Sequence, residues 1–194
     1  MTISVIVGSV GWQRGRCYAP YILSDGPLAS HDWKETVSDF LGSELVSGGF
    51  EIVLTDITKP WGVEFKIRED QAVQFLEAFF EDALNPSEIR ACPAGPKLLV
   101  IEQGQRFSWH VHARKEALLT VVRGVVTASL SATDVEPQPL GLAAGEVVHI
   151  PAQIRHRLGS RAGWAVVAEI SRNVFPDHPS DDQDSRRIED DYGR

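Results

Sequence analysis

Two histidines separated by one residue, His110 and His112, constrain this chain more than any other feature. Side chains alternate between the two faces of a β-strand, so both rings are predicted to lie on one face. A third histidine, His156, follows a proline-containing turn in the segment 145–158. Imidazoles brought together in this way can direct their ring nitrogens at one divalent metal ion, such as Zn, Mn, Fe, Co or Ni. The pattern therefore predicts strands that carry a metal centre.

The chain after residue 96 consists of short apolar runs separated by Gly, Pro and Asp. Six or more short strands with turn signals between them are typical of a β-sandwich or β-barrel. The expected strands are 97–102, 106–112, 117–123, 124–130, 145–151 and 164–171.

The first 90 residues have a mixed pattern. Strands are expected at 3–8, 50–56 and 63–67, and helices at about 30–41 and 69–84. We therefore expect three parts: an N-terminal extension of strands and two helices packed on the barrel (1–90), the barrel (91–176) and an acidic C-terminal tail (177–194). The acidic tail is predicted to be solvated and poorly ordered.

Charge and cysteine content limit the classes of partner. Lys and Arg total 19 against 27 Asp and Glu, a formal charge of −8, which argues against nucleic acid or an anionic membrane as a partner. Cys17 and Cys92 lack metal-type or redox-type spacing, so both are expected to be reduced thiols. The apolar N-terminal run is too short to span a bilayer, and a cytoplasmic protein is expected. Barrel edge strands are often covered by a partner, so a homodimer is compatible with the sequence.

The spacing of the histidines resembles the two motifs of the cupin family, G-x5-H-x-H-x(3,4)-E-x6-G and G-x5-P-x-G-x2-H. The positions that match the first motif are Gly104, His110, His112, Glu116 and Gly124. Those that match the second are Gly145, Pro151 and His156, with Gln153 in place of its glycine. The resemblance implies a mainly β fold, a cupin jelly-roll β-barrel, here with an N-terminal α/β extension. It also implies a metal held by His110, His112, His156 and Glu116.

One position departs from the family pattern. Seven residues separate Glu116 from Gly124, and the usual glutamate position holds Ala117. A shift of one residue moves a side chain to the opposite face of a strand. Either a bulge turns Glu116 inward, or the site has three histidines and no glutamate.

Further segments resemble the type II phosphomannose isomerase cupins over about residues 57–194. These segments are KPWG at 59–62, HIPAQIRHRL at 149–158 and the ending DDYGR. The resemblance implies aldose–ketose isomerisation of a small phosphorylated sugar at a divalent metal. It carries Arg157 over as a catalytic residue, and Lys59 and Trp61 as substrate contacts.

Such an isomerase moves a proton between C1 and C2 through an enediol, which needs a base near carbon and positive charge near oxygen. Glu116 is the first candidate for the base, and Glu169 on the last strand is the weaker one. Three basic residues beside the histidine motifs, Arg114, Lys115 and Arg155, are expected to bind the phosphate.

Two other functions share these ligands. A cupin dioxygenase would use Fe(II) with three histidines and Glu116, and would need an apolar pocket for an organic substrate. A non-catalytic cupin would bind a sugar or a metal without turnover.

Overall fold

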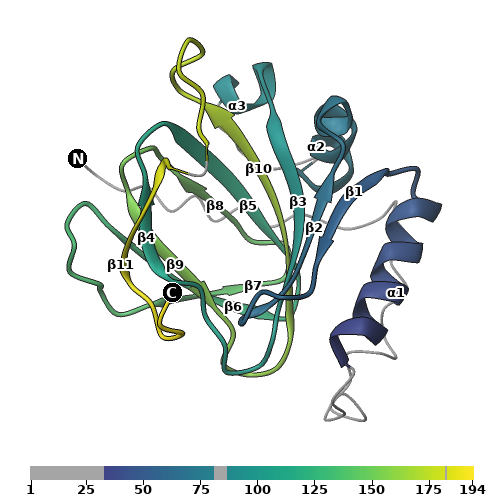
Figure 1. Ribbon diagram of the computed structural model, residues 1–194, viewed down its shortest axis with the longest axis horizontal. Helices are drawn as coiled ribbons and strands as arrows, with labels where there is room; N and C mark the ends of the chain where they lie inside the picture. Colours follow the sequence, from purple (N-terminus) through teal and green to yellow (C-terminus); the bar gives the residue numbers. More distant parts are fainter. Residues whose placement is uncertain (1–32, 81–86, 182) are drawn as a thin grey trace.

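The computed structural model describes residues 33–80, 87–181 and 183–194 (Figure 1). The strand expected at 3–8 and Cys17 lie outside these residues. Cys92 is exposed and has a free thiol. None of the helices in the described ranges is long and apolar enough to cross a membrane.

The helices all precede the barrel in the chain. They are α1 (Trp33–Ser47), the 3-10 turn η1 (Glu69–Gln71), α2 (Ala72–Phe80) and α3 (Ser87–Ala91). Both expected helices are present among the described residues, and α1 continues past Gly42, where the sequence predicted a stop.

The strands of the described residues form two antiparallel sheets. The first has the order β1 (Ile52–Asp56), β2 (Gly62–Ile67), β3 (Ala94–Ile101), β10 (Ala165–Asn173), β5 (Lys115–Arg123) and β8 (Val147–Ile150). The second has the order β11 (Ser185–Glu189), β4 (Trp109–His112), β9 (Arg155–Gly159), β6 (Val125–Ser131) and β7 (Leu140–Ala143).

The order of strands β3 to β10 is that of an eight-stranded jelly roll. The chain changes sheet at every step from β3 to β6 and again at every step from β7 to β10, and within this run only β6 and β7 follow each other in one sheet. The strands β3-β10-β5-β8 therefore face β4-β9-β6-β7. This confirms the expected mainly β, cupin-type jelly-roll fold. Strands β1 and β2 extend the first sheet, so the chain before residue 90 continues the barrel wall.

The tail beyond residue 176 also contributes a strand. β11 pairs with β4, with Arg187 opposite His110 and Ser185 opposite His112. The acidic composition predicted a poorly ordered end, but backbone pairing with β4 orders residues 185–189 and brings the tail to the histidines.

A turn glycine shows why one motif position needs that residue. Gly124, between β5 and β6, has φ +81°, and a Cβ there would lie 2.4 Å from the carbonyl oxygen of Trp164. Any side chain would therefore clash with the backbone and strain the turn.

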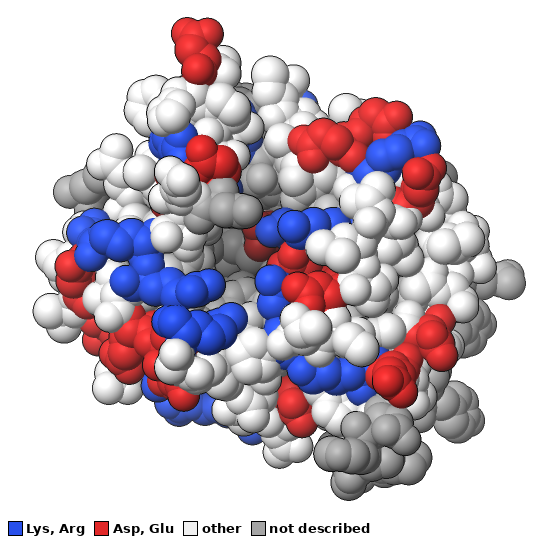
Figure 2. Space-filling view, viewed as in Figure 1, with Lys and Arg blue, Asp and Glu red and all other residues white. Residues whose placement is uncertain are grey.

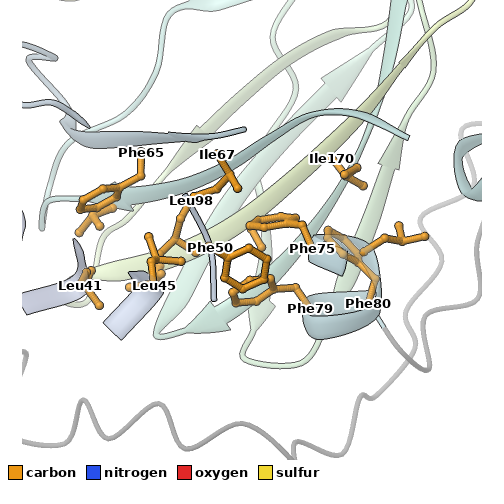
Figure 3. Packing of buried hydrophobic residues seen from close by; sticks show 14 of the residues in the cluster. Leu41, Leu45, Phe50, Phe65, Ile67, Phe75, Phe79, Phe80, Leu98 and Ile170 are labelled. Atoms are coloured by element: carbon orange, nitrogen blue, oxygen red, sulfur yellow. The ribbon is translucent and has the colours of Figure 1, made fainter. Parts of the chain in front are cut away.

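Both faces of the first sheet carry buried clusters, apart from its largely exposed edge strand β1. Its outer face packs against α1 and α2 in a cluster that includes Phe65, Phe75 and Phe80 (Figure 3). Phe75 contacts Phe79 with ring centroids 4.5 Å apart. Each phenylalanine stabilises the fold by about 1.5–3 kcal/mol through burial.

The inner face forms a second cluster with the opposite sheet, which includes Ala117, Leu119, Leu99 and Leu158. These two clusters fix which residues of each strand point into the barrel.

Candidate metal centre

Three histidines from two neighbouring strands meet inside the barrel. His110 and His112 share one face of β4, and His110 lies directly opposite His156 of β9. One ring nitrogen from each histidine lies within 4.8 Å of the other two. In the described part of the chain, these three residues form a cluster that could hold a metal ion. The ring centroids of His110 and His156 are 4.3 Å apart. The convergence predicted from spacing is therefore present.

Backbone carbonyls fix the tautomers of two of the rings. Nδ1 of His110 lies 2.9 Å from the carbonyl oxygen of Ser108, and Nδ1 of His156 lies 3.0 Å from that of Ile154. A carbonyl only accepts, so each Nδ1 carries the hydrogen and each Nε2 keeps its lone pair. This is the arrangement that a metal-binding histidine requires.

The third ring has a carboxylate behind it. Nδ1 of His112 is buried without a hydrogen-bond partner, and Oδ2 of Asp184 lies 3.7 Å from it. Asp184 itself accepts hydrogen bonds from the backbone N–H groups of Ala113 and Arg114, both at 3.0 Å. Its carboxylate is thus held beside the ring, where it favours a hydrogen on Nδ1 and a free Nε2.

Burial keeps the three rings neutral. It lowers the pKa of His110 and of His156, and lowers that of His112 to about 2, with help from the charge of Lys115. A neutral imidazole is the metal-binding form, so the donor set fits a divalent transition metal of the kind expected.

Glu116 does not join the histidines. Its carboxylate accepts hydrogen bonds from Nε of Arg172 at 2.8 Å and lies 3.2 Å from Nε2 of His149, on the outer side of the sheet. The β5–β8 register runs without a shift past Ala117, whose side chain belongs to the inner cluster. The expectation that Glu116 is a ligand and base is corrected for this physical reason: no bulge turns it inward, and the site has three histidines.

Glu169 is the carboxylate that faces the site. It follows Val167 by two residues on β10, and Val167 belongs to the inner cluster, so both point into the barrel. Its carboxylate lies 3.6 Å from Nζ of Lys115. Burial raises the pKa of Glu169, but the charges of Lys115 and Lys97 outweigh burial and leave the pKa below its ordinary value. The group is therefore ionised and can accept a proton.

Further charged side chains line the same wall and were missed by the sequence reasoning. Lys97 lies opposite Glu169 in the β3–β10 register and opposite Lys66 in the β2–β3 register. Glu64, two residues before Lys66, is buried on the same face. Their signal was present in the alternation of VEFKI, which places Glu64 and Lys66 on the face opposite Phe65. Figure 2 shows the hollow between the sheets, with Lys and Arg on both sides of it.

Arg155 and Arg157 do not face the hollow. Both lie on the other face of β9 from His156, where Arg155 pairs with Asp134 at 2.8 Å and Arg157 with Glu136 at 2.7 Å. Alternation along the strand dictates this outcome. The structure thus corrects their expected catalytic and phosphate-binding roles.

The remaining residues predicted to bind the substrate lie in different environments. Arg114 is held by Asp184 at 3.2 Å and Asp181 at 2.6 Å, so its guanidinium anchors the segment before β11. Trp61 is buried in the inner cluster and packs against Phe107 with tilted rings, whose centroids are 4.2 Å apart.

Lys59 pairs with Asp56 at 3.1 Å before β2 begins. Lys115, also predicted to contact the substrate, does lie beside the histidines. It pairs with Glu169 at 3.6 Å, and its charge lowers the pKa of His112.

Comparisons with known proteins give similarity at the level of fold. No protein-family model matches the chain. No curated protein matches it either. Among solved structures it is similar to a candidate sugar phosphate isomerase from Acidithiobacillus ferrooxidans, with 22% identity and a TM-score of 0.36, covering 41% of this chain and 50% of that one.

Two more solved structures are similar. The capsular polysaccharide assembling protein CapF from Staphylococcus aureus has 18% identity and a TM-score of 0.46, covering 84% of this chain and 38% of that one. A cupin-superfamily sugar phosphate isomerase from Silicibacter pomeroyi has 15% identity and a TM-score of 0.38, covering 58% and 60%. The chain therefore spans 60% or less of the length of these three structures.

Proposed function

We propose that the protein is a metal-dependent enzyme that isomerises a small phosphorylated sugar between its aldose and ketose forms. The observation that carries the proposal is the ionised carboxylate of Glu169, which points into the same hollow as three neutral histidines. The resemblance of the two histidine motifs and the KPWG segment to phosphomannose isomerase cupins supports the choice of reaction.

The histidines and Glu169 divide the chemistry between them. The free Nε2 atoms of His110, His112 and His156 would hold the metal, which when bound supplies positive charge to the carbonyl and enediolate oxygens. Glu169 takes the proton from one of the two carbons of the sugar and returns it to the other, so no oxidant or reductant is needed.

Lys115 has two effects on this transfer. Its ammonium, 3.6 Å from the Glu169 carboxylate, favours the ionised form that accepts the proton. The same positive charge lies close enough to His112 to lower the pKa of that ring, and there it can stabilise negative charge that develops on the substrate oxygens.

An Fe(II) dioxygenase is the second candidate, favoured by the three-histidine donor set without Glu116. Such an enzyme needs an apolar pocket for its organic substrate. The hollow instead carries Glu169, Lys115 and Lys97, and these charges favour a polar, anionic substrate. Oxygen consumption by the iron-loaded protein would distinguish the two reactions.

Deuterium exchange tests the proposal. The metal-reconstituted protein is incubated in D₂O with mannose 6-phosphate, fructose 6-phosphate and other phosphorylated sugars, and NMR follows deuterium at C1 and C2. We expect exchange on one of these sugars, and its loss with a chelator and in His112→Ala. No exchange on any sugar while metal stays bound would overturn the isomerase proposal, and binding without turnover would favour a non-catalytic cupin.

A further inference from the structure

Two lysines with the same charge lie directly opposite each other on the wall of the hollow. Lys66 of β2 and Lys97 of β3 are partners in the antiparallel register, and both point to the inner face of the sheet. Like charges directly opposite across two strands destabilise a sheet. A pair of this kind therefore calls for an anion between or beside the two ammonium groups.

A single carboxylate of the protein serves both lysines. Oε1 of Glu64 lies 3.9 Å from Nζ of Lys66, and Oε2 lies 3.9 Å from Nζ of Lys97. Both distances exceed the 2.7–3.2 Å of an N–H···O hydrogen bond. Glu64 lies near both lysines but hydrogen-bonds to neither, and the charge of Glu169 also acts on Lys97. Lys66 therefore has N–H donors free of Glu64, which a further anion can reach.

The lysine pair is partly exposed to solvent, and it extends from beside Glu169, which Lys97 faces, to Lys66 one strand further away. The side chain of Lys66 is 45% exposed and that of Lys97 is 23% exposed. β2 lies two strands from β10, which carries Glu169, and neighbouring strands are about 4.8 Å apart. The backbone of Lys66 is thus about 10 Å from that of Glu169, a separation that one ligand can bridge.

Arg187 adds a cation from the other sheet. It lies opposite His110 in the β4–β11 register and shares its face. Its charge acts on Asp190 without a short ion pair among the described residues, whereas the adjacent Arg186 pairs with Asp134 at 3.0 Å. The two arginines point to opposite faces of one strand, so Arg186 on the outer face can serve as a control for cations on the inner face.

We propose that Lys66 and Lys97, with Glu64 between them, form a subsite that binds a phosphate dianion independently of the metal. If the proposed isomerase function holds, this subsite receives the phosphate of the sugar while Glu169 acts at the other end of the molecule.

The test is binding of inorganic phosphate to the metal-free full-length protein, measured by isothermal titration calorimetry. Lys66→Gln and Lys97→Gln are each expected to weaken phosphate binding at least tenfold. Arg186→Gln, on the outer face, is the control and should bind phosphate as the wild type does.

A second readout separates a ligand site from a structural role. Because the side chain of Lys66 is 45% exposed and lies 3.9 Å from Glu64, Lys66→Gln without ligand should melt within about a degree or two of the wild type while its phosphate affinity falls. A lysine needed only for the fold would give a lower melting temperature.

Unchanged phosphate affinity in both lysine variants, or no phosphate binding by the wild type, would overturn the subsite. The outcome is independent of turnover: phosphate binding without isomerase activity contradicts only the proposed reaction, and isomerase activity with intact phosphate binding in Lys66→Gln contradicts only the subsite.

Discussion

The carboxylate of Glu169 on β10 and the ammonium of Lys115 on β5 lie 3.6 Å apart on the inner face of the first sheet. This pair provides the site with an ionised carboxylate that does not come from the strand on which the family motif places it. Glu116, the motif glutamate of the sequence, is bound instead to Arg172 outside the barrel.

Replacing Glu116 by glutamine should affect stability and leave the metal centre intact. The change removes a charge-assisted hydrogen bond to Arg172, whose side chain is 27% exposed, so the expected loss is about 1 kcal/mol of unfolding free energy. Urea unfolding measures this loss, and metal analysis of the same protein should give the wild-type stoichiometry. A drop in bound metal would contradict the outward position of Glu116.

The stability of the metal-free protein should fall as the pH is lowered below 6.5. Burial depresses the pKa of His110, His112 and His156 in the folded state, whereas an unfolded histidine protonates near pH 6.5. Unfolding then takes up protons, and the slope of unfolding free energy against pH reaches at most three protons, about 4 kcal/mol per pH unit. Above pH 6.5 the histidines are neutral in both the folded and the unfolded protein, so the full stability is present there and is lost only as the pH falls.

Urea titrations between pH 7.5 and 5.5 in the presence of a chelator measure that slope. His112→Ala should reduce it by about one proton, because one group with a depressed pKa is removed. A slope that is the same in the variant and the wild type would show that the ring of His112 is not held neutral.

Asp184 should couple the fold of the tail to the affinity for metal. Its side chain is fully buried, and Asp184→Ala leaves the N–H groups of Ala113 and Arg114 without their acceptor. We expect a loss of about 3 kcal/mol in stability and a 10–100-fold weaker metal affinity, because the carboxylate no longer orients His112. Denaturant unfolding and metal titration measure the two effects.

Asp181→Ala is the control for this prediction. Asp181 also pairs with Arg114, but its side chain is 56% exposed and it does not approach His112. A surface pair of this kind contributes at most about 1 kcal/mol. Equal effects of the two substitutions on metal affinity would contradict an orienting role for Asp184.

The histidine motif was the most predictive part of the sequence. Spacing alone placed His110 and His112 on one face, and the six strands expected after residue 96 all have counterparts in the structure. Alternation also places Arg155 and Arg157 on the face opposite His156, so their outward position follows from the same rule that placed the histidines.

Other features depend on tertiary contacts that periodicity does not contain. The apolar face of β2, with Phe65, packs against helices rather than into the barrel, and this leaves Glu64 and Lys66 inside. Whether Glu116 or Ala117 points into the barrel depends on whether β5 contains a bulge. Only the pairing of β5 with its neighbouring strands decides this. β11 is ordered by backbone pairing that an acidic composition does not indicate.

The most direct test of the account is a comparison of Glu169→Gln with Glu116→Gln in deuterium exchange at C1 and C2 of the active sugar phosphate, with metal content measured on the same samples. Both variants should retain one metal per chain. Glu169→Gln should lose at least 100-fold in exchange rate, as expected for removal of a general base, and Glu116→Gln should keep the wild-type rate. Exchange that survives in Glu169→Gln but is lost in Glu116→Gln would contradict the assignment of the base to β10.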